Sequence, residues 1–257
     1  MRAFGRTISI AAVLVSLAGM AAAADIRVLS VGAVQNAVRP LAAEFSKETG
    51  HKIVFTVGSP TVVAQKLKDG ETFDAVIVSE PAMDRLDNEG IVNPESRVRL
   101  ANTGIGVAVR AGAPMPNLST SDAFKQALLA AKSVVYGDPA LPNQSGEKAE
   151  QILAKAGLLD ALKGKLRITP GQAEGQDLIA KGEIEMGLYN LSEIPEGKGL
   201  KIAGPVPAPL QLATTYEGAL MSDGAVPEAS RAFIRFLAEP DARAKWIAAK
   251  LEPFADH

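Results

Sequence analysis

Short runs of β-branched and other apolar residues alternate with stretches in which apolar positions recur at helical spacing, along nearly the whole chain. The first such unit is a predicted strand at 26–30, a turn at Gly32 and Ala33, and a predicted helix over 35–49 that Gly50 ends as a C-cap residue. Strand, turn and amphipathic helix in this order form a βα unit. Repeated βα units predict helices packed on both faces of a mostly parallel sheet.

The same unit recurs through the rest of the sequence. Strands are predicted at 52–57, 75–78, 104–110, 133–136, 166–168, 186–189 and 214–220. Helices are predicted at 62–68, 83–88, 121–131, 147–156, 172–180, 227–237 and 241–249. The proline-rich stretch 204–209 cannot be helical and is interpreted as a connector. A second lobe is expected to begin after Leu100, so the predicted fold class is α/β with two lobes.

The N-terminal residues have the pattern of a secretory signal peptide rather than of a folded element. Arg2 and Arg6 supply a positive region, residues 8–20 an apolar region, and the alanines at 22–24 a small-residue cleavage pattern. The mature chain is therefore expected to start near Asp25, after cleavage close to Ala24, and to work in the periplasm. An uncleaved membrane anchor is the alternative, but the apolar run is shorter than the ~20 residues that span a bilayer.

Composition and charge narrow the chemistry. The chain has no cysteine, which excludes disulfides and thiolate zinc sites, and its two histidines are His51, interpreted as a turn residue, and the last residue. The 27 basic and 29 acidic residues give a formal net charge of -2 without any long block of like charge. A nucleic-acid surface would need a basic stripe, so nucleic acid is not expected as a partner. No metal and no cofactor are expected.

Candidate chemistry lies at helix starts that directly follow strands. The first amides of a helix lack intrahelical partners, and the helix dipole places partial positive charge there, so such starts can bind an anion without a cationic side chain. In an open α/β sheet these starts converge beyond the carboxyl ends of the strands. Capping alone is the alternative explanation for small and hydroxyl residues there. The residues predicted to contact a ligand at these junctions are Gly32, Ala33, Ser59, Thr61 and Ser145.

Charged and phenolic side chains near predicted strand ends are few. Arg110 ends a strand and could hold a carboxylate through two hydrogen bonds, although an exposed surface charge is the alternative. Tyr189 could donate its phenol to an anion or be a structural tyrosine. Asp138 and Glu193 stand at loop starts, where turn chemistry explains both without a catalytic role.

Six short segments form an ordered set along the mature chain. They are 28–33 (VLSVGA), 45–50 (FSKETG), 58–61 (GSPT), 69–71 (DGE), 73–77 (FDAVI) and 251–253 (LEP). This set resembles the periplasmic substrate-binding proteins of molybdate-type ABC transporters. No single segment is diagnostic, but the similarity covers essentially the whole mature chain.

The resemblance implies two α/β lobes joined by a hinge, with an anion held in the cleft by backbone amides, serine hydroxyls and a tyrosine. The expected lobes are 25–102 together with 210–257, and 103–209. The implied partners are a small anionic ligand and an ABC permease in the inner membrane, and the expected state is a monomer. By position, the binding groups of the family fall on Ala33, Ser59, Pro60, Ser145, Gln172 and either Tyr189 or Asn190.

Two positions depart from the pattern of the family. Ala33 and Pro60 lack hydroxyls that a molybdate binder would be expected to use, and Pro60 also lacks an amide proton. Each donor lost from a charged acceptor costs about 1.5–3 kcal/mol. The departures therefore argue against molybdate and favour an organic carboxylate.

Four other segments, 112–114, 136–139, 188–193 and 204–207, look closer to a divergent branch of the family that includes periplasmic aconitate isomerase. The leading hypothesis is a binding protein that closes its lobes around a small anion and delivers it to a permease. The alternative is an isomerase that moves a proton across an allylic carbanion of an aconitate-like acid. Its candidate groups would be Glu193, Tyr189 and Asp138.

Overall fold

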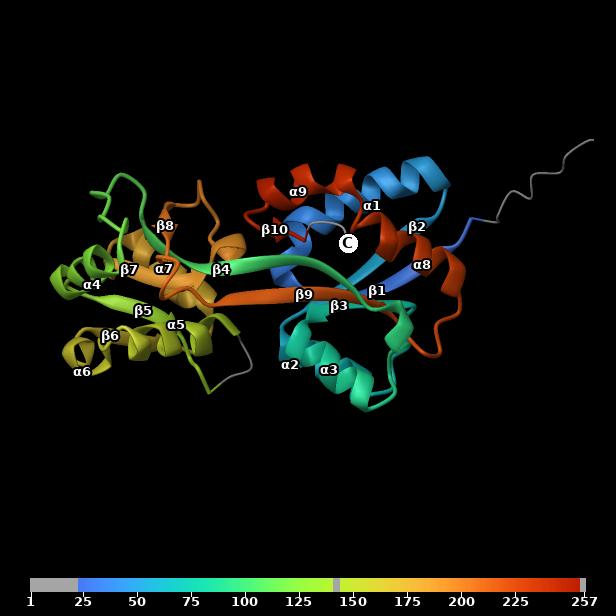
Figure 1. Ribbon diagram of the computed structural model, residues 1–257, viewed down its shortest axis with the longest axis horizontal. Coiled ribbons are helices and arrows are strands. Elements are labelled where there is room, and N and C mark those ends of the chain that lie inside the picture. Colours follow the sequence, from blue (N-terminus) through green and yellow to red (C-terminus); the bar gives the residue numbers. More distant parts are fainter. Residues whose placement is uncertain (1–22, 141–143, 255–257) are drawn as a thin grey trace, which may run out of the picture.

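Two lobes lie side by side, each a sheet with helices on both faces (Figure 1). The computed structural model describes residues 23–140 and 144–254, so residues 1–22 of the predicted signal peptide lie outside the described residues. Two long strands, β4 (Val98–Arg110) and β9 (Ala213–Leu220), run between the lobes and pair antiparallel with each other. None of the described helices combines the length and apolarity that a membrane crossing needs.

The first lobe is built on parallel strands. β1 (Asp25–Val31) lies between β2 (Lys52–Gly58) and β3 (Ala75–Ser79), and β3 pairs antiparallel with β9. Its longer helices are α1 (Gln35–Thr49), α2 (Pro60–Lys68), α3 (Glu80–Asn88), α8 (Pro227–Phe236) and α9 (Arg243–Ala248). Helices α1, α8 and α9 cover one face of the sheet and α2 and α3 the other (Figure 1). Shorter pieces are η1 (Gly32–Val34), η2 (Pro94–Ser96), η4 (Pro240–Ala242) and β10 (Glu252–Pro253).

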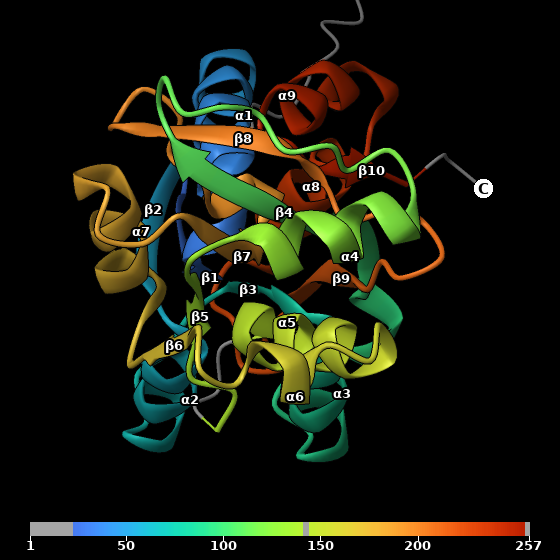
Figure 2. The ribbon, with the colours of Figure 1, turned by 90° about the vertical axis from the view of Figure 1, so that its left-hand side faces the viewer.

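The second lobe has the same layering. β5 (Val134–Gly137) pairs in parallel with β6 (Leu166–Thr169) and β7 (Met186–Asn190), while β4 pairs antiparallel with β7 and with β8 (Leu200–Pro205). Its helices are α4 (Ser121–Ala130), α5 (Gln144–Lys155), α6 (Leu159–Leu162), α7 (Gln172–Lys181) and the turn η3 (Leu191–Glu193). Viewed from this lobe, α7 lies on one side of the sheet and α4 to α6 on the other (Figure 2).

The strands of the second lobe bury alternate residues on opposite faces. Val107 and Val109 of β4 contribute to the apolar core under α4 to α6, whereas Ala108 contributes to the core under α7. On β7, Leu188 and Tyr189 divide in the same way. Successive side chains of a strand point to opposite faces, so helices on both sides of the sheet give each face its own apolar cluster.

Local signals in the sequence are confirmed at the ends of the helices. Gly50 follows α1 in the left-handed conformation at φ 77°, and its N–H donates to the carbonyl of Ser46. Ser59 caps α2, because its Oγ accepts from the N–H of Val62 at 3.3 Å while Pro60 occupies the first turn. The two-lobed α/β fold is therefore the one that the sequence predicts, although both sheets are mixed, because β1 to β3 and β5 to β7 pair in parallel while β4 and β9 pair antiparallel.

Several predicted elements are corrected, and the longest shift is in β4, which begins at Val98 rather than at residue 104. Residues 204 and 205 of the proline-rich stretch form the end of β8 rather than a connector, since Gly204 and Pro205 pair with Val107 and Gly106. A proline at a strand terminus costs little because no further ladder N–H is required of it. Helix α3 begins at Glu80, directly after β3, and not at residue 83 as predicted.

We propose that the lobe boundaries lie at 102/103 and 209/210. Supporting this division, one apolar cluster contains buried residues up to Ala101 and again from Tyr216 onward, and the two clusters of the other lobe take theirs from the intervening segment. The chain crosses between the clusters at β4 and again just before β9. Rotation of one lobe against the other would then concentrate at these crossings.

Gln211 holds the second crossing against the first. Its Oε1 accepts from the N–H groups of Ile105 at 2.7 Å and Leu212 at 3.0 Å, and its Nε2 donates to the carbonyls of Ile105 at 2.9 Å and Val206 at 3.1 Å. Gly104 leaves room for it, because a Cβ at Gly104 would lie 2.8 Å from the amide carbon of Gln211. One side chain thus satisfies backbone groups of β4 and of the segment between β8 and β9, where the ladder between β4 and β9 ends.

Replacing Gln211 with alanine is expected to lower the free energy of unfolding by about 2–4 kcal/mol, since several backbone groups lose their partner. Urea unfolding followed by circular dichroism measures the change. The matched control is Gln126→Ala on the exposed face of α4, which should change stability by less than about 0.5 kcal/mol. Equal effects of the two substitutions would contradict the role given to Gln211.

Candidate ligand-binding cleft

A cavity of about 580 Å³ lies between the lobes, at the carboxyl ends of the parallel strands. The first lobe lines it with the ends of β1, β2 and β3 and the helix starts that follow them. The second lobe lines it with the starts of α5 and α7, the end of β7 and the turn η3. At its base η3 lies against η1, so the lobes touch there. This is the place where open α/β sheets collect ligands.

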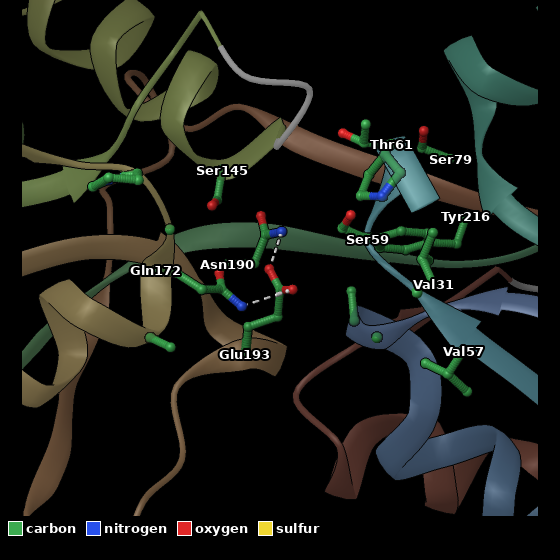
Figure 3. Close-up of a pocket in the computed structure, with 17 residues that line it drawn as sticks. Val31, Val57, Ser59, Thr61, Ser79, Ser145, Gln172, Asn190, Glu193 and Tyr216 are labelled. Atoms are coloured by element: carbon green, nitrogen blue, oxygen red, sulfur yellow. Dashed lines mark hydrogen bonds between the residues drawn. The ribbon is translucent and has the colours of Figure 1, made fainter. Parts of the chain in front are cut away.

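Most residues predicted to contact a ligand line this cavity (Figure 3). They reach it because each follows a strand end at the start of a helix or turn. From the first lobe these are Gly32, Ala33, Ser59, Pro60 and Thr61, and from the second Ser145, Gln172 and Asn190. Their role in binding stays a prediction, whereas their convergence on one cavity is a property of the fold.

The structure does not bring Arg110 to the cavity. Its exposed side chain lies beside Gly182, which follows the C-terminal end of α7, while the cavity is at the N-terminal end of the same helix. A cation is favourable near a helix C-terminus because the dipole is negative there. Arg110 is thus placed where it complements α7 and cannot reach a ligand in the cleft.

Tyr189 and Asp138 also lie away from the described lining of the cavity. Tyr189 is fully buried under α7, with its hydroxyl against Gly175, where an added Cβ would collide with it. Because strand residues alternate, its neighbour Asn190 faces the cleft, and of these two positions Asn190 stays the predicted contact. Asp138 accepts from the N–H of Ala140 at 2.9 Å, as turn chemistry predicts.

Sequence reasoning missed two polar residues of the lining, Ser79 and Tyr216. Ser79 precedes α3 just as Ser59 precedes α2, so a correct start for α3 would have found it. Tyr216 sits within β9, where it pairs with Ser79 of β3 and Ala101 of β4. No local signal marks it, because its position follows from the pairing of strands far apart in sequence.

Glu193 is the charged side chain of the described lining, and two amides hold it (Figure 3). Asn190 Nδ2 donates to Oε2 at 2.7 Å and Gln172 Nε2 donates to Oε1 at 3.0 Å. The Nε2 of Gln176 donates to the backbone carbonyl of Glu193 at 2.9 Å and so fixes the turn itself. Burial raises the pKa of Glu193 above its ordinary value, and the two side-chain hydrogen bonds partly oppose that rise.

Across the cavity, burial and the negative charge of Glu193 raise the pKa of Tyr216 well above its ordinary value. No lysine, arginine or histidine belongs to the described lining. Positive potential must therefore come from the starts of α2, α3, α5 and α7 and of the η1–α1 segment. In the described part of the chain there is also no cluster of histidine, aspartate and glutamate suited to a metal ion.

Comparison with known proteins identifies the family. A model described as bacterial extracellular solute-binding protein matches residues 26–249, and the chain belongs to this family. The chain is 37% identical over 221 residues to aconitate isomerase from a Pseudomonas species, covering 84% of this chain and 82% of that protein. It is 25% identical over 241 residues to the molybdate-binding protein ModA of Azotobacter vinelandii, covering 88% and 89%.

The fold agrees with this membership. The solved periplasmic molybdate-binding protein of Azotobacter vinelandii superimposes with a TM-score of 0.72 at 22% identity, over 90% of this chain and 100% of that one. The resemblance to molybdate-type substrate-binding proteins is thus confirmed, and of these relatives the isomerase is the more similar in sequence. The chain stands in a divergent branch of the molybdate-type group.

Glu193→Gln is expected to change how stability depends on pH. A carboxyl whose pKa is raised on folding binds protons more readily when folded, so wild-type stability falls as pH rises from the ordinary value of 4.5 through the raised value. The amide that replaces the carboxyl in the variant does not titrate. The stability of wild type relative to the variant should therefore decline between pH 4 and pH 8 in urea unfolding experiments.

The matched control is Ser192→Ala on the same turn, which removes no titratable group and should shift stability equally at every pH. A difference between wild type and Glu193→Gln that does not vary with pH would contradict a raised pKa for this partly buried carboxyl.

Proposed function

We propose that this protein is a periplasmic solute-binding protein that captures a small organic carboxylate in the cleft between its lobes. The observation that carries the proposal is the convergence of several helix starts and hydroxyl side chains from both lobes on one cavity without a cationic side chain in its described lining. Closure of the lobes would combine donors from both sides around the anion and exclude water, which strengthens each contact.

An organic acid suits the cleft better than a tetrahedral oxyanion. Ala33 and Pro60 lie in the wall, where a hydroxyl at either position could have donated to a compact oxyanion. The cavity of about 580 Å³ has room for a molecule with several carboxyl groups. The relative with 37% identity is named for its action on aconitate, a tricarboxylate, which points to the same class of ligand.

Delivery to an ABC permease of the inner membrane, by a monomer, follows from the family and forms part of the proposal. Solute-binding proteins of this kind work with such a permease. The signal-peptide pattern before Asp25 supports export to the periplasm.

A second function, isomerisation of an aconitate-like acid, is favoured by Glu193. Isomerisation needs a base within reach of a carbon-bound proton, and the partly buried Glu193 supplies a titratable carboxylate in the described lining. Glu193 would remove one proton from the methylene carbon of cis-aconitate, leaving an allylic carbanion. Helix starts would stabilise its charge, and return of one proton to the former vinyl carbon would give trans-aconitate.

The binding proposal is tested by thermal shift and calorimetry with tricarballylate, trans-aconitate and molybdate. A carboxylate at 100 times its dissociation constant should add about 2.7 kcal/mol, which for a chain of this size raises the melting temperature by roughly 5–10 °C. Thr61→Glu puts a like charge on the exposed rim and should weaken carboxylate binding about tenfold or more.

Two control variants remove side chains that lie away from the cavity. Arg110→Ala and Tyr189→Phe should bind the acids as wild type does. Tighter binding of molybdate than of either acid would overturn the argument from Ala33 and Pro60. Loss of binding in both controls would remove the cleft from consideration.

The isomerase function is tested by proton NMR of cis-aconitate in D₂O. Turnover should yield trans-aconitate with one deuterium in its new methylene group, and Glu193→Gln should lower the rate by about 100-fold or more. Ser192→Ala is the control and should keep the wild-type rate. A wild-type rate in Glu193→Gln would remove Glu193 as the base, and a wild type without turnover would leave binding as the function.

A further inference from the structure

Two hydrogen-bond acceptors stand together in the cleft, apart from its hydroxyl side chains. One is the carboxylate of Glu193, on η3, and the other is the side-chain carbonyl of Asn190, at the end of β7. Both face the cavity in Figure 3, opposite Ser59 and Thr61 of the first lobe. Hydroxyl side chains and helix starts elsewhere in the lining can donate to ligand oxygens, whereas these two groups accept.

The orientation of Asn190 follows from its neighbour. Its Nδ2 must face Glu193, at 2.7 Å, because an amide oxygen in that position would meet a carboxylate oxygen and be repelled. Its Oδ1 therefore points away from Glu193. Asn190 is only 3% exposed, and Oδ1 has no hydrogen-bond partner among the described residues. An unsatisfied buried acceptor is unfavourable, so a donor brought by a ligand would be favoured there.

The charges around Glu193 also favour a ligand group that donates a hydrogen bond. The described lining offers Glu193 no cation, and the titratable group facing it from β9 is the phenol of Tyr216, which stays neutral in the physiological range because burial and Glu193 raise its pKa. Both carboxylate oxygens of Glu193 already accept one amide hydrogen, and each keeps capacity for another. A ligand carboxylate placed against these acceptors would be repelled, whereas a ligand O–H would be bound.

We propose that the ligand presents an O–H group to Glu193 and Asn190 while its carboxylates face the helix starts. The cleft would then select a hydroxy acid, or an acid that keeps one carboxyl protonated, over an acid whose oxygens all lack hydrogen. This inference rests on the proposed binding of an organic carboxylate and names the substrate class more narrowly.

Pairs of acids that differ by one hydroxyl test the inference. Citrate is compared with tricarballylate, and malate with succinate, by calorimetry at pH 8. The hydroxy acid of a pair that binds should bind about 10- to 100-fold more tightly, the range expected for one hydrogen bond to a charged acceptor. Repeating the titrations in buffers of different ionisation enthalpy separates the two sources of O–H. A hydroxyl donor gives no proton uptake, and a protonated carboxyl gives uptake of about one proton per ligand.

Two variants locate the effect. Glu193→Gln removes the charge. If the donor is a hydroxyl, the affinity ratio of each pair should fall to about one in this variant. If the donor is a protonated carboxyl, the variant should abolish proton uptake by the acid that lacks a hydroxyl. Ser192→Ala, next to it in the chain but outside the described lining of the cleft, should keep the wild-type ratio.

The outcomes separate the inference from the proposed function. If none of the four acids binds and trans-aconitate does not bind either, the proposed function fails. If both acids of a pair bind equally and without proton uptake, carboxylate binding stands and the O–H inference is overturned. A full affinity ratio in Glu193→Gln would place the discrimination elsewhere and would overturn it as well.

Discussion

The antiparallel pairing of β4 with β9 is the constraint on which the cleft depends. β9 pairs with β3 and β4 in the sheet of the first lobe, and β4 continues into the second lobe, where it pairs with β7, so this register fixes which strand ends of one lobe face those of the other. Parallel strands carry their helix starts at one edge, and β4, which both sheets share, turns the two edges toward each other (Figure 1). Gln211 reinforces the pairing at the point where backbone hydrogen bonding between the two strands ends.

The electrostatics of the cleft follow from this geometry. With no cationic side chain in the described lining, attraction for an anion depends on main-chain groups that the fold itself aligns. The carboxylate of Glu193, held by Asn190 and Gln172, is the exception, because it makes one region of the wall negative and hydrogen-bond accepting. That asymmetry can orient an elongated acid, because one end of the acid would face donors at the helix starts and the other end would face the acceptor Glu193.

Sequence reasoning recovers features that depend on neighbours in the chain. The strand–turn–helix order, the cap at Ser59 and the left-handed Gly50 are local, and the structure bears them out. The cleft wall at Ala33, Ser145 and Gln172 is predicted as well, because parallel βα units place their junctions at a common edge. Features set by pairing between distant strands are not recovered. Tyr216 reaches the cavity only through the partners of β9, and Arg110 is carried away from it along β4.

The position of Glu193 in the cleft wall has an evolutionary consequence. Glu193 lies on a short turn after β7, outside the apolar clusters that stabilise either lobe. A change of residue there leaves the apolar clusters intact, so two proteins of this architecture can differ in the chemistry of the cleft by very few side chains. Such a scaffold allows new reactivity to arise in a lineage of transport proteins while the inherited framework is left intact.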